Sequence, residues 1–201
     1  MRHLLQGVSY VFHPLFIPMG GTLSYFLVTP RLNPLELQSG NILPIFILTI
    51  IIPIILFLIL KNLGLISSIL APELRERKYP LYFSMIIYLM ILYKIIPLNY
   101  VNELYYFFVG LLIASFSTLL LLFTRIKGSI HLMGMGSILI YLIGLSIHFE
   151  VNITFAIALL TLMTGLVATS RLFMKAHTKM ELLLGFIVGT CSQLFVLKYW
   201  L

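Results

Sequence analysis

Three side chains between residues 170 and 181 have the types and the spacing needed for nucleophilic chemistry on an anion. His177 and Glu181 are four residues apart, so on a shared helix they would lie on one face, within reach of each other. A carboxylate bonded to one imidazole nitrogen fixes the tautomer and leaves the other nitrogen able to attack. Arg171 precedes His177 by six residues and offers a planar fork of N–H donors that suits phosphate oxygens.

The same stretch also fits a purely structural interpretation. Thr178 and Glu181 have the Ser/Thr-x-x-Glu spacing of a capping box, and a long apolar run follows them. In that case Glu181 caps the first turn of a helix, and His177 lies just outside the helix. These residues alone leave both interpretations open, so the rest of the chain must decide between them.

The composition is that of a protein surrounded by lipid. Of the 201 residues, 61% are apolar and only 9% are charged, whereas soluble domains carry about 25% charged residues. We expect one integral membrane domain over residues 1–201. The net charge of +7 lies mainly in short loops between apolar runs, which suits lipid head groups or a phosphorylated substrate and not nucleic acid. A single cysteine, Cys191, excludes an internal disulfide and a cysteine-based zinc site.

Seven segments are long and apolar enough to span a membrane, which takes about 20 residues. They predict an all-α, polytopic transmembrane bundle of about six or seven spanning helices. The predicted spans are about 4–29, 42–61, 80–97, 103–123, 131–149, 152–169 and 180–200.

Three polar islands interrupt this pattern, and an even number of predicted spans separates each island from the next. The first island, residues 75–80, contains Arg77 and Lys78 and precedes the third span. The second, residues 125–131, contains Lys127, Ser129 and His131 and follows the fourth span, and the third is the stretch 170–181. Two spans separate each island from the next, and an even number of crossings returns the chain to the same face. We therefore expect all three islands to meet on one side of the membrane.

One more ionisable residue lies inside a predicted span. His13 is followed by Pro14 and Pro18, which predict a kink in the first helix. An ionisable side chain within the membrane indicates function by default. A histidine that bonds a backbone carbonyl freed by the prolines is an equally good interpretation.

The third island resembles the third signature of the type-2 phosphatidic acid phosphatase (PAP2) superfamily, Ser-Arg-x5-His-x3-Asp. Here the pattern is Ser170-Arg171-x5-His177-x3-Glu181, with glutamate in place of aspartate. The second island is similar to half of the second signature, Pro-Ser-Gly-His, through Ser129 and His131. The first island is similar only to the end of the first signature, Lys-x6-Arg-Pro: Pro80 is present, but Tyr79 replaces the arginine and no lysine occupies the matching upstream position. The resemblance covers about residues 61–197.

This resemblance implies a lipid phosphatase that uses neither a metal ion nor another cofactor. His177 would attack phosphorus and form a phosphohistidine, and Glu181 would orient it. His131 would protonate the leaving oxygen and then activate water. The expected partners are a lipid phosphate or diphosphate substrate and membrane lipids, and no oligomeric state follows from the sequence. The residues expected to hold phosphate oxygens are Arg171, Ser129, Lys127, Arg77 and Lys78.

Two other functions fit the same residues. A non-catalytic protein that binds or transports lipid phosphates could retain the scaffold, and the incomplete first signature favours it. A structural membrane protein would need Glu181 only as a cap. Binding of vanadate, a mimic of the phosphate transition state, would distinguish an enzyme from a structural protein.

The distribution of basic residues predicts which side of the membrane the islands face. Ten of the 13 lysines and arginines lie on the side of the islands, and three, Arg31, Lys94 and Lys198, lie on the other. An excess of Lys and Arg in short loops marks the cytoplasmic face. The family resemblance points the other way, since many bacterial members act on the outer face of the inner membrane. We expect a bacterial inner-membrane protein with the islands on the cytoplasmic side.

Overall fold

Every regular element in the described part of the chain is helical. The computed structural model describes residues 2–30, 35–65, 74–96 and 101–201. The bounds of the elements are α1 Arg2–Val11, the 3₁₀ turn η1 Pro14–Phe16, α2 Ile17–Val28, α3 Leu35–Phe46, the π-helical turn η2 Ile47–Ile51, α4 Ile52–Asn62, α5 Leu74–Lys94, α6 Asn102–Phe123, α7 Ile130–His148, α8 Thr154–Phe173 and α9 Lys179–Leu197.

Six helical segments within the described residues are long and apolar enough to cross a membrane. They are Leu5–Val28, Gly40–Asn62, Asn102–Phe123, Ile130–His148, Thr154–Phe173 and Lys179–Leu197. The predicted third span, 80–97, corresponds to α5, which is not among the six; it carries charged residues in its first turns and Lys94 in its last. The all-α, polytopic architecture expected from the sequence is confirmed, and the chain has the make-up of an integral membrane protein.

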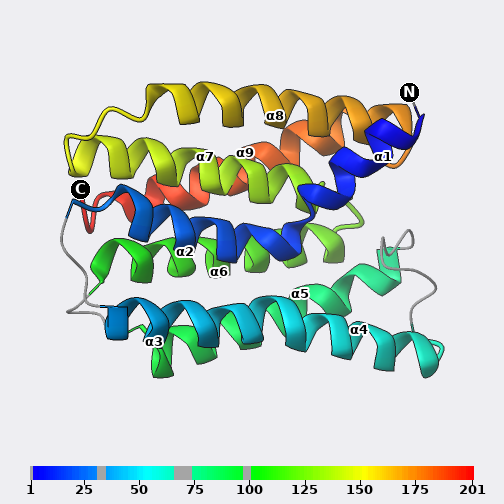
Figure 1. The fold of residues 1–201 in the computed structure, drawn as a ribbon. Coiled ribbons are helices and arrows are strands. Elements are labelled where there is room, and N and C mark those ends of the chain that lie inside the picture. Colours follow the sequence, from blue (N-terminus) through cyan, green and yellow to red (C-terminus); the bar gives the residue numbers. More distant parts are fainter. Residues whose placement is uncertain (1, 31–34, 66–73, 97–100) are drawn as a thin grey trace.

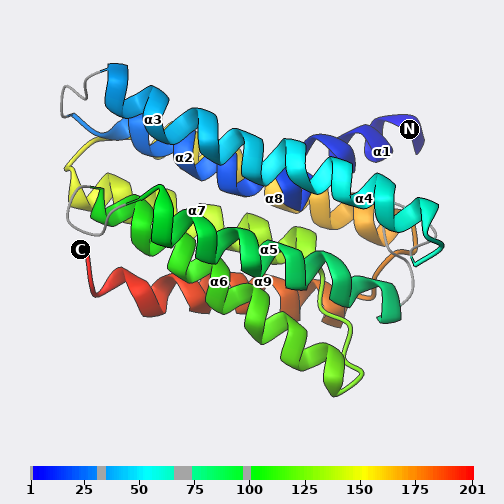
Figure 2. The same ribbon diagram turned by 90° about the horizontal axis from the view of Figure 1, so that it is seen from below.

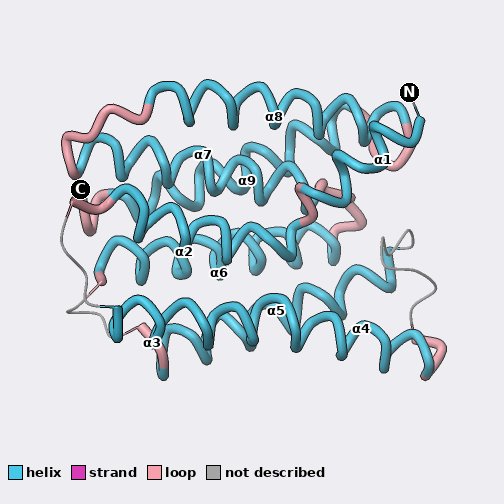
Figure 3. Tube along the Cα trace, in the orientation of Figure 1, coloured by secondary structure: helices cyan, strands magenta, loops and turns pink. Residues whose placement is uncertain are grey.

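The long helices lie side by side and run up and down along roughly one axis, with α7 at the centre (Figures 1 and 2). Helix α7 packs against α2, α6, α8 and α9, and 72% of its span is buried inside the protein. The turns that join α6 to α7 and α8 to α9 lie at the same end of the bundle as the N-terminus, while the C-terminus lies at the opposite end (Figure 3). The second and third islands therefore meet at one end, which we call the island end.

Glycines allow α7 and α9 to approach closely. A Cβ atom at Gly185 would overlap the carbonyl oxygen of Ser129, and one at Gly189 would overlap that of Met133. At Gly136 a Cβ would lie 2.8 Å from the carbonyl oxygen of Phe186. Small residues at such contacts let membrane helices pack backbone to backbone. This packing holds the start of α7 against the second and third turns of α9.

Prolines break the first helical rod where the sequence predicts a kink. Helix α1 ends at Val11, and the chain continues through extended backbone at His13 (φ −66°, ψ 141°) into η1 and α2. A residue before proline avoids the helical conformation because the proline ring crowds its backbone. The break turns the side chain of His13 toward the interior of the island end, where it lines a cavity.

Candidate functional site

A cavity of about 230 Å³ opens at the island end of the bundle. Part of its wall carries four side chains that could bind or transfer protons or anions: His13, His131, Arg171 and His177. The other walls are mainly apolar and come from α2, α4, α5, α6 and α7. These four side chains come from three separate parts of the sequence, so the fold brings them together.

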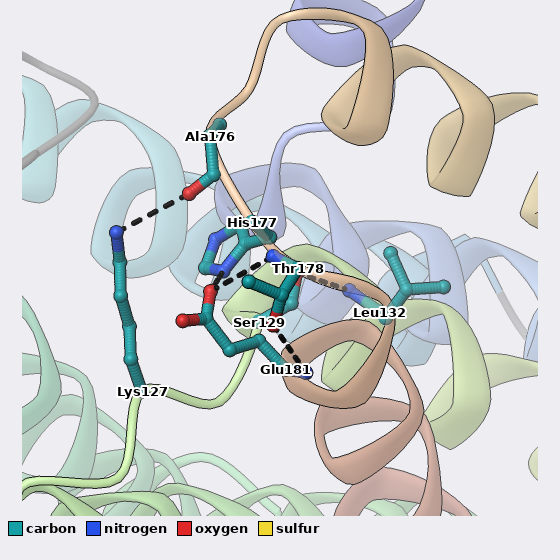
Figure 4. A network of polar contacts seen from close by, with 7 residues as sticks. All are labelled: Lys127, Ser129, Leu132, Ala176, His177, Thr178 and Glu181. Carbon is teal, nitrogen blue, oxygen red and sulfur yellow. Dashed lines mark hydrogen bonds and ion pairs between the residues drawn. The ribbon is translucent and has the colours of Figure 1, made fainter.

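His177 and Glu181 form the contact that their spacing predicts. His177 Nδ1 donates to Glu181 Oε2 over 2.8 Å (Figure 4). The imidazole is nearly buried, with 2% of its side chain exposed, against 23% for that of Glu181. A proton held on Nδ1 by the carboxylate places the lone pair of the neutral ring on Nε2. This is the tautomer that a nucleophilic histidine requires.

The two residues do not share a helix. Helix α9 begins at Lys179 with Thr178 as its N-cap, so His177 lies just before the helix. Glu181 Oε2 also accepts from the backbone N–H of Thr178 at 3.3 Å, and Thr178 Oγ1 accepts from the N–H of Glu181 at 3.3 Å. The capping box is therefore complete. Glu181 caps the helix and holds His177 at the same time, so the two interpretations of the sequence do not exclude each other.

Arg171 brings a buried charge to the cavity. It lies in the last turn of α8, and only 2% of its surface is exposed. Its Nε and Nη1 atoms are buried without a hydrogen-bond partner among the described residues. Its own carbonyl oxygen accepts from the N–H of Ala176 at 3.1 Å, which closes the turn that carries His177. A buried guanidinium normally has an anionic or other acceptor partner, so Arg171 is the candidate anion-binding group of the cavity.

Ser129 and Lys127 lie near the site, but they connect its turns and do not line the cavity. The N–H of Ser129 donates to the carbonyl oxygen of Glu181 at 3.0 Å, and Ser129 Oγ caps α7 by accepting from Leu132 N at 3.4 Å. Lys127 Nζ donates to the carbonyl oxygen of Ala176 at 3.2 Å (Figure 4). These contacts indicate that Ser129 and Lys127 position the third island. The sequence had instead predicted that both residues bind phosphate directly.

The first island contributes less than the sequence predicted. Lys78 is exposed, its Nζ lies 5.4 Å from the centre of the Tyr79 ring, and it does not line the cavity. The side chain of Arg77 lies outside the described residues. Pro80, the last residue of the island, and Leu81 directly after it do line the cavity. In the described part of this island, the contribution to the cavity wall is therefore apolar.

His131 lies in the first turn of α7 and is held by the N-terminal helix. Its Nε2 donates to the carbonyl oxygen of Ser9 at 3.3 Å, so the proton of the neutral ring is on Nε2 and the lone pair is on Nδ1. Ser9 Oγ in turn lies 2.7 Å from Ser170 Oγ, which donates to the carbonyl oxygen of Leu5 at 2.6 Å. Helix α1 is thereby joined to both His131 and the serine of the third island.

His13 is the site residue that the sequence did not place. Its ring centre lies 5.2 Å from that of His131, with the two rings nearly perpendicular at 83°. The sequence indicated either function or a bond to a freed carbonyl. The second interpretation is wrong, because His13 Nδ1 accepts from the backbone N–H of Leu15 at 3.3 Å. In the sequence, the feature that marked His13 as unusual was the His13-Pro14 pair inside an apolar run.

No family model, curated protein or solved structure matches this chain. The likeness to the PAP2 superfamily therefore rests on the residues of the three islands, and the roles it implies are proposals. Within the described residues, no group of three His, Cys, Asp or Glu side chains is arranged to hold a metal ion. What the site offers is a buried guanidinium, a carboxylate-oriented histidine and two further imidazoles around an apolar cavity.

Proposed function

We propose that this protein is a membrane-embedded phosphatase that hydrolyses a lipid phosphate or diphosphate through a phosphohistidine, as its resemblance to the PAP2 superfamily implies. The observation that carries the proposal is the buried guanidinium of Arg171, unpartnered at Nε and Nη1 among the described residues, in the same cavity as His177. A phosphate group would supply the missing acceptors. It would also lie within the cavity that the nucleophile lines.

The first step transfers the phosphoryl group to the protein. His177 Nε2 attacks phosphorus, the bond from phosphorus to the lipid oxygen breaks, and Glu181 stabilises the charge that develops on the imidazole. His131 Nδ1 takes up the proton that the phosphate group brings and passes it to the leaving oxygen. The leaving group departs as an alcohol from a lipid phosphate and as a lipid monophosphate from a diphosphate. Arg171 stabilises the charge on the phosphoryl oxygens throughout.

The second step regenerates the histidine. Water attacks phosphorus, its proton moves to His131 Nδ1, and the bond from phosphorus to His177 Nε2 breaks. The proton on His131 leaves with the released phosphate, so both imidazoles return to their starting state. Lys127 and Ser129 contribute indirectly, because they fix the turn that carries His177 against the first turn of α7.

The apolar walls of the cavity favour a lipid over a soluble phosphate. Helix α4 lines the cavity through residues such as Phe57 and Leu60, and α5 through Leu81, Phe83 and Ile87. Burying hydrocarbon against such walls yields roughly 25 cal/mol per Å². A substrate whose phosphate reaches Arg171 and whose chain lies along α4 and α5 would use both parts of the cavity.

A second candidate is a non-catalytic protein that binds or transports lipid phosphates. The small number of cations in the cavity favours this candidate. Lys78 and Lys127 do not line the cavity, and among the described residues Arg171 is the one lysine or arginine that does. An enzyme that stabilises a phosphoryl transition state commonly uses several cations. The presence or absence of turnover distinguishes this candidate from the phosphatase.

Phosphate release by the purified protein tests the proposal and the role of Arg171 together. We expect release from at least one of phosphatidate, phosphatidylglycerophosphate, a prenyl diphosphate and a lipid A phosphate. Arg171→Met should lower kcat/KM by about 10²- to 10³-fold, as loss of one oxyanion donor does elsewhere. The matched control is Arg125→Met, an exposed arginine in the neighbouring turn. Lipid phosphate binding without release would favour the second candidate, and neither binding nor release would contradict both.

We place the island end on the cytoplasmic side of a bacterial inner membrane, because that side carries the excess of lysine and arginine. In a Cys191→Ala background, a cysteine replacing Lys179, which is exposed at the start of α9, should resist a membrane-impermeant thiol reagent in intact cells. A cysteine replacing Lys198, exposed beyond the far end of α9, should react. The reverse labelling pattern would put the site outside.

A further inference from the structure

The N-terminal helical rod is built into the site by three contacts. The carbonyl oxygen of Ser9 accepts from His131, and its hydroxyl bonds that of Ser170, next to Arg171 in the chain. The carbonyl oxygen of Leu5 accepts from Ser170 Oγ at 2.6 Å. These bonds fix the position of α1 relative to α7 and α8. The break that follows α1 therefore brings His13 to the cavity in a defined place.

The hydrogen bond of His13 determines what its imidazole can offer. The backbone N–H of Leu15 donates to Nδ1, so the proton of the neutral ring is on Nε2. A second proton on Nδ1 would displace this backbone bond, which caps η1. His13 is thus held as a neutral donor, and its Nε2–H has no hydrogen-bond partner among the described residues.

His13 and His131 have opposite tautomers. His131 gives its Nε2–H to the carbonyl oxygen of Ser9 and keeps an acceptor at Nδ1, whereas His13 keeps a donor at Nε2. The rings meet edge to face, with centres 5.2 Å apart, and both line the cavity together with Arg171. A phosphate group carries oxygens that need donors and, when protonated, one hydroxyl that needs an acceptor. The pair offers one of each.

We propose that His13 is a phosphate-binding residue, which donates its Nε2–H to an oxygen of the substrate beside the guanidinium of Arg171. The inference rests on the proposed function and adds a contact from the N-terminal rod, a part of the chain outside the three islands. Because the donor is neutral, it adds binding and orientation without adding charge that would retain the product. His13 is a binding residue here, and proton transfer stays with His131.

The test measures competitive inhibition of lipid phosphate hydrolysis by inorganic phosphate, together with KM and kcat. His13→Asn keeps a side-chain oxygen that can cap η1 through Leu15 N–H, but it lacks a donor at the distance of Nε2. We expect both Ki for inorganic phosphate and KM to rise about tenfold or more, as for loss of one hydrogen bond to a charged group. We expect a smaller change in kcat. His13→Leu, which removes cap and donor, should show at least the same loss of affinity.

The matched control is His148→Gln. His148 lies at the far end of α7, outside the cavity lining, and its Nε2 lies 3.0 Å from Glu103 Oε1. This variant should leave Ki and KM unchanged. If His13→Leu fails to fold, His13→Asn carries the test alone. A His13→Asn protein with the Ki of the wild type would overturn the inference while the phosphatase proposal stands. A wild-type protein that releases no phosphate would instead remove the proposed function on which the inference rests.

Discussion

Replacement of His177 with alanine should reduce phosphate release by at least about 10⁴-fold, in line with the loss of the nucleophile in other enzymes that form covalent intermediates. The reason is that, among the described residues of the cavity, His177 is the one acceptor for the phosphoryl group that a carboxylate orients: Glu181 Oε2 holds its Nδ1 at 2.8 Å. Without the imidazole, water must attack directly. The remaining activity would come from Arg171 and His131 alone.

The structure also predicts that this variant folds. His177 lies in the turn before α9, and that turn is closed by backbone bonds from Lys175 to Leu172 and from Ala176 to Arg171, which need no side chain. Thr178 continues to cap α9. The apparent melting temperature in detergent should therefore stay close to that of the wild type.

Trapping of the intermediate provides a second readout. Protein quenched during turnover of a ³²P-labelled lipid phosphate should retain label in the wild type and none in His177→Ala. The His148→Gln protein, which changes a histidine at the far end of the bundle, should behave as the wild type does. An alanine variant with activity near that of the wild type would show that His177 is not the nucleophile.

The sequence predicted the helical architecture because the apolar runs are long and the polar islands are few. Membrane spans need about 20 apolar residues, and little else in a protein produces that pattern. The spacing of His177 and Glu181 also predicted their contact, since it depends only on the local backbone around the start of α9. The meeting of the second and third islands followed from the even number of crossings between them.

The directions of individual loop side chains could not be predicted in the same way. Lys127 reaches the carbonyl oxygen of Ala176 because both adjoining turns pass through left-handed backbone, with φ of 62° at Arg125 and 54° at Lys175. Neither residue type signals that conformation, which is uncommon outside glycine, asparagine and aspartate. The presence of a basic residue in these turns therefore does not predict whether its side chain faces the cavity.

The position of His13 depended on contacts that no local pattern encodes. Ser9 and Ser170 are 161 residues apart in the sequence, and their hydroxyl groups meet at 2.7 Å. The proline break was visible in the sequence, but its place against α7 and α8 follows from this long-range packing. The sequence could mark His13 as unusual, and only the fold could bring it next to His131.

Glu181 gives the second large effect, because its two functions can be separated by substitution. Glu181→Gln keeps an oxygen that can cap α9, and glutamine also serves in capping boxes. It loses the negative charge that stabilises the imidazolium, so we expect phosphate release to fall by about 10²- to 10⁴-fold, the upper figure being that for a neutral replacement in a serine protease triad. The melting temperature should change little.

Two companion variants identify which function matters. Glu181→Asp keeps the charge on a side chain one methylene shorter and restores the residue of the PAP2 signature, so it should retain more activity than Glu181→Gln. Thr178→Ala removes the hydroxyl that accepts from Glu181 N–H at 3.3 Å and leaves the carboxylate on His177. It should lower the stability by about 1 kcal/mol, as the loss of an N-cap does, with turnover nearly unchanged. If Glu181→Gln released phosphate as fast as the wild type and also kept its stability, Glu181 would be a cap alone, because glutamine serves equally in a capping box. The carboxylate would then have no part in orienting His177 for attack.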